Sequence, residues 1–208
     1  MYKQKSTDYA KIAIIYYFLS MLGLFAMGIL LKSNSSWYHL IYIILFIVPV
    51  ITVLLKDKSI VDLGISKNNN LAKNLLIASI MIIITFIYSM FKSDFTMPKL
   101  LKTAFYYLFY IGLTEEILYR GFIQNYLFGL KLNRYIIFII GGIFFSLIHL
   151  PFQMYVHNMV SIAYIIQAIP QLISTFIIHL LFCYITYKRK DILITVAIHF
   201  AMNFLQSI

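Results

Sequence analysis

The stretch that decides the fold is LLKTAFYYLFYIGLTEEILYRGFIQNYLF, residues 100–128. It is apolar over most of its length, as a membrane-spanning helix is, yet it contains Glu115 and Glu116, the only two glutamates of the chain. A carboxylate near the middle of a bilayer costs about 3 kcal/mol on insertion scales, and ionisable residues at that depth usually have a function. The two acids, with Arg120 one helical turn after Glu116, are therefore candidate functional residues.

The composition is that of an integral membrane protein. Of the 208 residues, 62% are hydrophobic and 12% are charged, whereas about one quarter of the residues in soluble domains are charged. The first apolar run follows three lysines, as in a secretory signal, but it is too long and lacks a small-residue cleavage site, so we expect a retained helix. Cys183 is the only cysteine, which excludes an internal disulfide and a cysteine-based zinc cluster.

The apolar runs predict an all-α fold, a polytopic membrane helix bundle of about seven to eight transmembrane helices, because about 20 apolar residues are needed to cross the hydrocarbon core. The sixth run is too long for one simple crossing, and Pro170 divides it. Residues 158–169 therefore belong either to that span or to a separate interfacial or re-entrant helix. The predicted spans are 10–31, 37–55, 71–91, 101–128, 134–150, 159–187 and 191–207.

The basic residues predict a cytoplasmic N terminus. With seven spans, only Lys32, Lys92, Lys99 and Lys102 fall outside, as the positive-inside rule requires. The net charge of +10 is largely explained in this way, so the lipid bilayer, and not nucleic acid, is the expected partner. The residues predicted on the cytoplasmic side are Lys3, Lys5, Lys11, Lys56, Lys58, Lys67, Lys73, Lys131, Arg134, Lys188, Arg189 and Lys190.

Helix geometry predicts different tasks for the two glutamates. Adjacent residues of a helix point about 100° apart, so we expect that Glu115 and Glu116 do not meet the same partner. Glu116 and Arg120 have the favoured acid-before-base spacing of four, and pairing would neutralise both charges in lipid. Glu115 is then free to face another helix, which makes it the better candidate for a base that acts on water.

Two later spans contain histidines with polar neighbours. His149 ends the fifth span, and His199 lies four residues before Asn203 in the seventh, so that His199 and Asn203 share one helix face. His179 and Cys183 have the same spacing in the sixth span, but no acid lies nearby, so a metal pair there is the less favoured alternative. Counted along the helices from their presumed cytoplasmic ends, Glu115 and His149 lie about 20 Å deep, Asn203 slightly less and His199 about 12 Å. His199 is thus expected to be the least well placed of the group.

Three motifs occur in order on successive predicted helices: Glu115-Glu116-x-x-x-Arg120, Phe145-x-x-x-His149 and His199-x-x-x-Asn203. Together they resemble the motifs of the CAAX protease and bacteriocin-processing (CPBP, or Abi) family, which includes the eukaryotic Ras-converting CAAX endopeptidases. The resemblance covers about residues 100 to 205. We therefore describe residues 1–208 as a single integral-membrane domain, with variable N-terminal spans in 1–98 and a catalytic core in 99–208.

The resemblance implies an intramembrane endopeptidase, a hydrolase that cleaves a membrane-associated peptide or protein substrate. Glu115 and His149 would activate a water molecule, while His199 and Asn203 would stabilise the oxyanion. Glu116 and Arg120 would shape the site. The family is often described as metalloproteases, so a divalent metal, Zn2+, is expected on Glu115, His149 and His199. The motif leaves the metal open, because it lacks the His-Glu-x-x-His pair of soluble zinc proteases and one carboxylate does not easily serve as both ligand and base.

Other functions compete with hydrolysis. A buried Glu, Arg and His cluster could serve a transporter or a proton- or ion-translocating protein, and a non-catalytic membrane scaffold is a further alternative. No aspartate lies deep in a predicted span, which excludes a paired-aspartate protease. The enrichment in Ile, Lys and Asn is typical of an AT-rich bacterial genome, so we expect a multi-pass protein of a bacterial cell membrane. Bacteriocin immunity or peptide maturation is then the expected role, and a prenylated CAAX protein is not the expected target.

Overall fold

The computed structural model describes residues 1–65 and 70–208, and this part of the chain is helical with no strand. Lys67, predicted on the cytoplasmic side, lies outside the described residues. The elements are α1 (Thr7–Lys32), α2 (Trp37–Asp57), the 3-10 turn η1 (Ile60–Leu63), α3 (Leu71–Lys92), α4 (Met97–Phe105), the π-helical η2 (Tyr106–Leu113) and η3 (Glu116–Ile123), α5 (Gln124–Tyr126), the 3-10 turn η4 (Leu127–Leu130), α6 (Arg134–Leu147), α7 (His149–Val156), α8 (Ile162–Arg189) and α9 (Leu193–Gln206).

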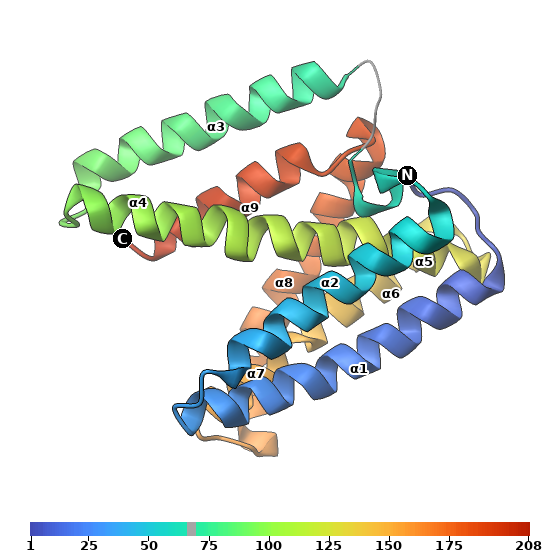
Figure 1. Ribbon diagram of the computed structural model, residues 1–208, viewed down its shortest axis with the longest axis horizontal. Coiled ribbons are helices and arrows are strands. Elements are labelled where there is room, and N and C mark those ends of the chain that lie inside the picture. The colour runs from blue at the N-terminus through green and yellow to red at the C-terminus, as the bar shows by residue number, and fades with distance from the viewer. Residues whose placement is uncertain (66–69) are drawn as a thin grey trace.

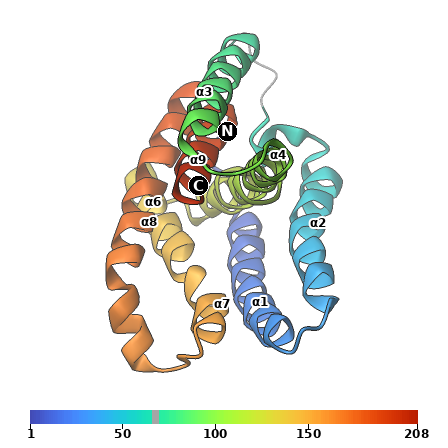
Figure 2. The ribbon, with the colours of Figure 1, turned by 90° about the vertical axis from the view of Figure 1, so that its left-hand side faces the viewer.

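Residues 97–130 form one continuous helical run, which we call the long helix and which includes α4, η2, η3, α5 and η4. It crosses the middle of the molecule in Figure 1, with α3 and α9 on one side and α1 and α2 on the other. Figure 2 shows it nearly end-on, with the other helices arranged around it. Among the packed pairs are α3 with α9, α9 with η2, α1 with α2 and α7, and α6 with α8. The predicted polytopic helix bundle is confirmed, and its central helix is the one that carries both glutamates.

The outer surface of the bundle is apolar and many of its buried side chains are polar, as a lipid solvent requires. Large aliphatic and aromatic side chains are exposed along α1, α2, α3 and α8, while Asn74, Glu116, Arg120, Gln124 and His179 are buried. Five described helices are long and apolar enough to span a membrane, namely α1, α2, α3, the α6–α7 unit and α8. The long helix and the shorter apolar α9 are further helices of the bundle. The termini lie at opposite ends of the molecule (Figure 1).

Pro170 does not divide the sixth span. Helix α8 runs from Ile162 through Pro170 to Arg189 without a break, so the alternative of a separate interfacial helix over 158–169 is wrong. Membrane helices tolerate proline where hydroxyl groups and neighbouring helices satisfy the backbone. Two residues after the proline, the carbonyl oxygen of Leu172 accepts from the hydroxyls of Ser146 on α6 and of Thr175, at 2.5 and 3.1 Å.

The start of α9 is buried against neighbouring segments of the protein. Asp191 and Ile192 have no exposed surface, and the Ile192 amide donates to the carbonyl oxygen of Gly64 at 3.0 Å. The carboxylate of Asp191 accepts hydrogen bonds from Asn74 of α3 and from the Leu193 amide. These contacts tie the start of α9 to the first turn of α3 and to the segment after η1.

Candidate functional site

Glu115 and Glu116 lie at the junction of two π-helical stretches of the long helix. Residues 114–115 separate η2 from η3. π-helical turns are rare and are frequent at functional sites. The hydroxyls of Tyr42, from α2, and of Thr114 both bond the carbonyl oxygen of Tyr110, and they lie 2.8 Å from each other. A side chain from a second helix thus holds the π-helical turn that directly precedes Glu115.

Glu116 and Arg120 form the ion pair that their spacing predicts. Arg120 Nη1 lies 3.0 Å from Glu116 Oε1, and neither side chain has any exposed surface. The guanidinium lies against the rings of Phe145, at 4.0 Å from the centroid, and Phe182, at 5.0 Å. Within the described residues its nitrogens donate no hydrogen bond of good geometry, so the carboxylate and the two aromatic faces are what stabilise this desolvated cation. Arg120 is buried away from any surface that a substrate could reach in this structure.

His199 contacts both glutamates. Its Nδ1 lies 2.9 Å from Glu116 Oε1, and its Nε2 lies 3.8 Å from Glu115 Oε2. A carboxylate oxygen accepts, so the N–H of Nδ1 donates to Glu116, and Nε2 is directed at Glu115. One imidazole ring of α9 thereby contacts two acidic side chains of the long helix.

Two expectations about this contact were wrong. Glu115 and Glu116 do meet the same partner, because an imidazole ring that lies between them offers one nitrogen to each. His199, expected to be the least well placed of the group, is also the histidine that contacts both acids. Gly112 brings α9 close to the long helix: a Cβ at this position would lie 3.6 Å from backbone atoms of Val196 and Phe200.

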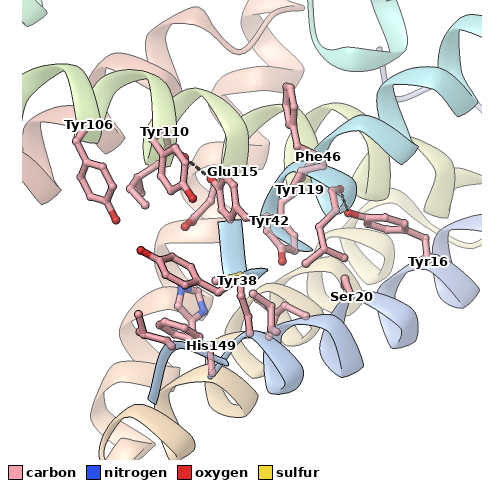
Figure 3. Close-up of a pocket in the computed structure, with 18 residues that line it drawn as sticks. Tyr16, Ser20, Tyr38, Tyr42, Phe46, Tyr106, Tyr110, Glu115, Tyr119 and His149 are labelled. Carbon is pink, nitrogen blue, oxygen red and sulfur yellow. Dashed lines mark hydrogen bonds between the residues drawn. The ribbon is translucent and has the colours of Figure 1, made fainter. Parts of the chain in front are cut away.

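Glu115 also lines a cavity of about 350 Å³, together with His149. Figure 3 shows Glu115 on the long helix and His149 at the start of α7, with tyrosines around them. Half of the eighteen lining residues come from α1 and α2. The lining residues are Tyr16, Ser20, Leu24, Met27, Leu31, Tyr38, Tyr42, Leu45, Phe46, Tyr106, Tyr110, Ile111, Glu115, Leu118, Tyr119, Ile148, His149 and Phe152.

The backbone fixes which nitrogen of His149 can act as a base. Its Nδ1 lies 2.8 Å from the carbonyl oxygen of Phe145. A carbonyl oxygen only accepts, so Nδ1 carries the proton in this bond and the neutral ring has its lone pair on Nε2. Nε2 makes no hydrogen bond within the described residues, so His149 has a free acceptor beside Glu115.

The structure does not bring Asn203 to the cavity, and it does not gather the predicted zinc ligands into one group within the described residues. Asn203 is half-buried, does not line the cavity and has no hydrogen bond within the described part of the chain, so its oxyanion role stays a prediction. No group of three His, Cys, Asp or Glu side chains in residues 1–65 and 70–208 is arranged to hold a metal ion. Glu115, His149 and His199 are thus not gathered as a metal site in this part of the chain, and zinc binding by them stays a prediction.

A second polar cluster lies beside the ion pair, between the long helix, α6 and α8. His179 Nε2 lies 3.0 Å from Gln124 Oε1 and 3.1 Å from Cys183 Sγ, and all three side chains are buried. Gly141 makes room for them, because a Cβ there would lie 1.8 Å from Gln124 Oε1. The spacing of His179 and Cys183 therefore reflects a packed structural contact with Gln124.

The motifs did not predict the tyrosines of the cavity wall. Helix α2 contributes Tyr38 and Tyr42 to this wall, and η2 contributes Tyr106 and Tyr110. Tyr42 stacks on Tyr110 with ring centroids 4.1 Å apart. The signal that could have found them is their spacing of four on each helix, 38 with 42 and 106 with 110, which puts each pair on one helix face.

One comparison with known proteins identifies a similar family. The family model described as Type II CAAX prenyl endopeptidase Rce1-like matches residues 97–205. This range starts at the first residue of α4, ends within α9, and covers just over half of the chain. It contains Glu115, Glu116, Arg120, His149, His199 and Asn203. No curated protein and no solved structure matches the chain.

Proposed function

The chain belongs to the Rce1-like family of type II CAAX prenyl endopeptidases, and from this premise we propose that Glu115 and His149 activate the water that cleaves a peptide bond inside the membrane. The family that the three motifs suggested is confirmed. It is a family of proteases, and the chain is a multi-pass membrane protein. Because the chain belongs to a family of proteases, hydrolysis is favoured over the alternatives of a transporter and a scaffold.

The observation that supports this assignment is that Glu115 and His149 line one cavity and that both have free acceptor atoms. Glu115 is 27% exposed and has only the 3.8 Å contact with His199, whereas Glu116 is fully buried. In His149 the free acceptor is Nε2, because Nδ1 donates to the carbonyl oxygen of Phe145. A general base must reach the proton that it removes, directly or through one water, and only the carboxylate of Glu115 among the two acids meets that condition.

In the proposed reaction, water bound between Glu115 and His149 loses a proton to the carboxylate as its oxygen attacks the peptide carbonyl carbon. A C–O bond forms and the carbonyl becomes an oxyanion. The C–N bond then breaks, and the amine leaves with the proton that the base has taken up. His199, oriented by Glu116, holds Glu115 in position, and Glu116 with Arg120 fixes the helix. We retain Asn203, with His199, as the proposed stabiliser of the oxyanion.

Glu115→Gln tests the assignment of the base. Glutamine keeps the shape of the side chain and removes its basicity, so we expect cleavage of membrane peptides to be abolished while the variant accumulates in the membrane at the wild-type level. His149→Ala should behave in the same way. Asp94→Asn, on the exposed turn before α4, is the matched control and should keep full activity. Wild-type cleavage by Glu115→Gln would exclude Glu115 as the base.

The biological role and the metal are further parts of the proposal. We propose a bacterial cell-membrane enzyme that matures peptides or confers bacteriocin immunity, and membrane-peptide profiles of a deletion strain and its complemented parent test this role. Zinc stays a prediction because the three expected ligands are not gathered in the described residues. About one equivalent of bound zinc, with loss of activity on chelation and recovery on addition of zinc, would support it. Full activity of protein shown by elemental analysis to be metal-free would leave the glutamate and histidine mechanism.

A further inference from the structure

The start of α6 and the end of α8 bring several cations together on the surface of the bundle. Arg134 begins α6 and Lys190 caps the end of α8, and the two helices lie side by side (Figure 2). Arg134 donates a hydrogen bond to the hydroxyl of Tyr187, which joins the two helix ends. All the cations at these ends that we call the basic patch are exposed, namely Lys131, Arg134, Lys188 and Lys190.

Two cations of the basic patch share one aromatic ring. Arg134 Cζ lies 5.0 Å from the ring centroid of Tyr187, and Lys190 Nζ lies 4.3 Å from the same centroid. Lys188 Nζ lies 5.7 Å from the ring of Tyr184. Such contacts hold a cation in place without neutralising its charge. The patch is thus a preformed cluster of positive charge.

No acid neutralises this charge. Within residues 1–65 and 70–208, none of the four patch cations forms an ion pair with a carboxylate. The carboxylate of Asp191 is bonded to Asn74, and that of Asp62 accepts from Lys5 and Asn125. The charge of the basic patch is therefore available to an anion from outside the protein.

Two lysines of the basic patch occupy backbone positions that suit glycine better. Lys131 and Lys190 have φ angles of 58° and 65°, in the left-handed region, and each caps the end of a helix. Glycine is the usual residue at such a cap, because a Cβ makes this conformation unfavourable. Lysine at these positions therefore lowers stability relative to glycine, while it adds a cation to the patch.

The exposed side chains place the basic patch at the level of lipid headgroups. Along α8 the exposed large hydrophobic side chains are aliphatic as far as Leu181, and Tyr184 follows before the basic residues. On α6 the order is the reverse, with Arg134 first, then Tyr135, and aliphatic side chains from Ile136 onward. Aliphatic, tyrosine and cation is the order of the hydrocarbon core, the aromatic belt and the polar surface of a bilayer.

An apolar groove lies between the same two helices. It has a volume of about 330 Å³, and its lining includes Ile143 of α6 with Ile169, Ile173 and Phe176 of α8. Ile143 is nine residues after Arg134, which corresponds to roughly 14 Å along a helix. An acyl chain extends about 15 Å from the headgroup level to the middle of the bilayer. A lipid whose headgroup lies on the basic patch can therefore place an acyl chain in the groove.

We propose that the basic patch binds the phosphate of an anionic phospholipid, and that an acyl chain of this lipid occupies the groove between α6 and α8. The guanidinium of Arg134 and the ammonium of Lys190 are the main contacts of the phosphate, since both are held on Tyr187. Basic sites between membrane helices are suited to anionic lipid headgroups. This inference goes beyond the proposed function and does not rest on it.

The test compares two lipids that differ in charge. The purified full chain in dodecyl maltoside micelles is titrated with dioleoyl phosphatidylglycerol or dioleoyl phosphatidylcholine, and apparent dissociation constants are obtained from the rise in melting temperature. Each juxtamembrane cation favours an anionic lipid by about fivefold, so we expect phosphatidylglycerol to bind at least tenfold more tightly. In the double variant Arg134→Gln with Lys190→Gly this ratio should fall to about threefold or less.

The matched control is Lys92→Gln with Lys102→Gln, which removes the same charge from exposed lysines outside the basic patch and should keep the wild-type ratio. Lys190→Gly alone guards against misfolding, because glycine suits the left-handed cap. It should melt close to the wild type in phosphatidylcholine and still have a lower ratio. An unchanged ratio would mean that Lys190 only caps the helix.

Three further outcomes would overturn the inference. Equal affinity of the wild-type chain for the two lipids would show that the basic patch does not select an anionic headgroup. An equal fall of the ratio in both double variants would assign the preference to the net charge of the protein. A rise in melting temperature with inorganic phosphate alone, as large as that with phosphatidylglycerol, would identify a free anion and not a lipid as the ligand.

Discussion

Arg120 has no exposed surface, so its side chain acts first on the structure of the site. Arg120→Ala would leave the Glu116 carboxylate buried with only His199 as a partner. Breaking a buried pair in this way costs about 3–5 kcal/mol, and the contacts with Phe145 and Phe182 are lost as well. We therefore expect a large fall in the melting temperature and in abundance, together with loss of activity.

Two companion variants separate charge from packing. Arg120→Lys keeps a cation but loses the flat contact with the rings, so its stability should lie between those of wild type and Arg120→Ala. The double variant Glu116→Leu with Arg120→Leu removes both charges and should be more stable than Arg120→Ala, while remaining inactive. A wild-type melting temperature for an inactive Arg120→Ala would instead place Arg120 in contact with the substrate.

Tyr42 positions Glu115 through the π-helical turn. Tyr42→Phe removes the hydroxyl that bonds the Tyr110 carbonyl oxygen and Thr114. Each lost hydrogen bond costs about 0.5–1.5 kcal/mol of stability, and a small displacement of the base lowers turnover further. We expect kcat to fall about tenfold with little change in KM. Tyr16→Phe, which removes a cavity hydroxyl bonded to the Leu45 carbonyl on the far side, should change kcat much less. An equal effect of the two variants would contradict a positioning role for Tyr42.

The residue contacts that the sequence could predict are the local ones. The pair of Glu116 and Arg120 follows from a spacing of four on one helix, which holds whatever the neighbouring helices do. The contact of His199 with both acids depends on how α9 packs on the long helix, including the close approach at Gly112. No one-dimensional count along the chain contains that information.

At the scale of elements, apolar runs predicted most helix positions well. The span predicted over 37–55 is helix Trp37–Asp57, and the one over 71–91 is helix Leu71–Lys92. The two π-helical stretches were not predicted, because they depend on tertiary contacts such as that of Tyr42. The continuous path of α8 through Pro170 was one of two alternatives that the sequence left open.

Helix packing around the second polar cluster depends on Gly141. In Gly141→Ala the new methyl group would collide with Gln124 Oε1 and approach His179 Nε2, 3.0 Å away. We expect a loss of about 1–3 kcal/mol, since overpacking and a broken buried hydrogen bond act together. A fluorescence melting assay of the purified protein measures the change.

Gly23→Ala is the matched control within another helix. A Cβ at Gly23 would meet only the end of the Leu45 side chain, at 3.1 Å, which can move. Alanine is favoured over glycine inside a helix by about 1 kcal/mol, so this variant should be as stable as wild type or more so. Destabilisation of both variants by the same amount would show that Gly141 has no special place in the packing.

In the whole molecule, an ionic cluster and the mouth region of the cavity lie toward opposite ends. The end that holds the N terminus carries an ionic cluster in which Lys5 pairs with Asp62 at 2.8 Å and Asp57 at 3.6 Å, and most of the basic residues lie there. The cavity instead extends along α1 and α2 to Leu31 and Tyr38, next to the connection between those helices at the other end. If the basic end faces the cytoplasm, as the positive-inside rule predicts, the cavity extends toward the outer side of the membrane.

Single-cysteine labelling tests this orientation, and the chain is suited to it because its only cysteine, Cys183, is fully buried. Ser36→Cys lies in the exposed connection between α1 and α2, and Lys188→Cys lies near the exposed end of α8. With a membrane-impermeant maleimide, we expect Ser36→Cys to react in intact cells and Lys188→Cys to react only after permeabilisation. Tyr38→Cys, in the cavity wall, should also react in intact cells. The opposite pattern for Ser36→Cys and Lys188→Cys would place the N terminus outside, and the substrate would then reach Glu115 from the cytoplasmic side.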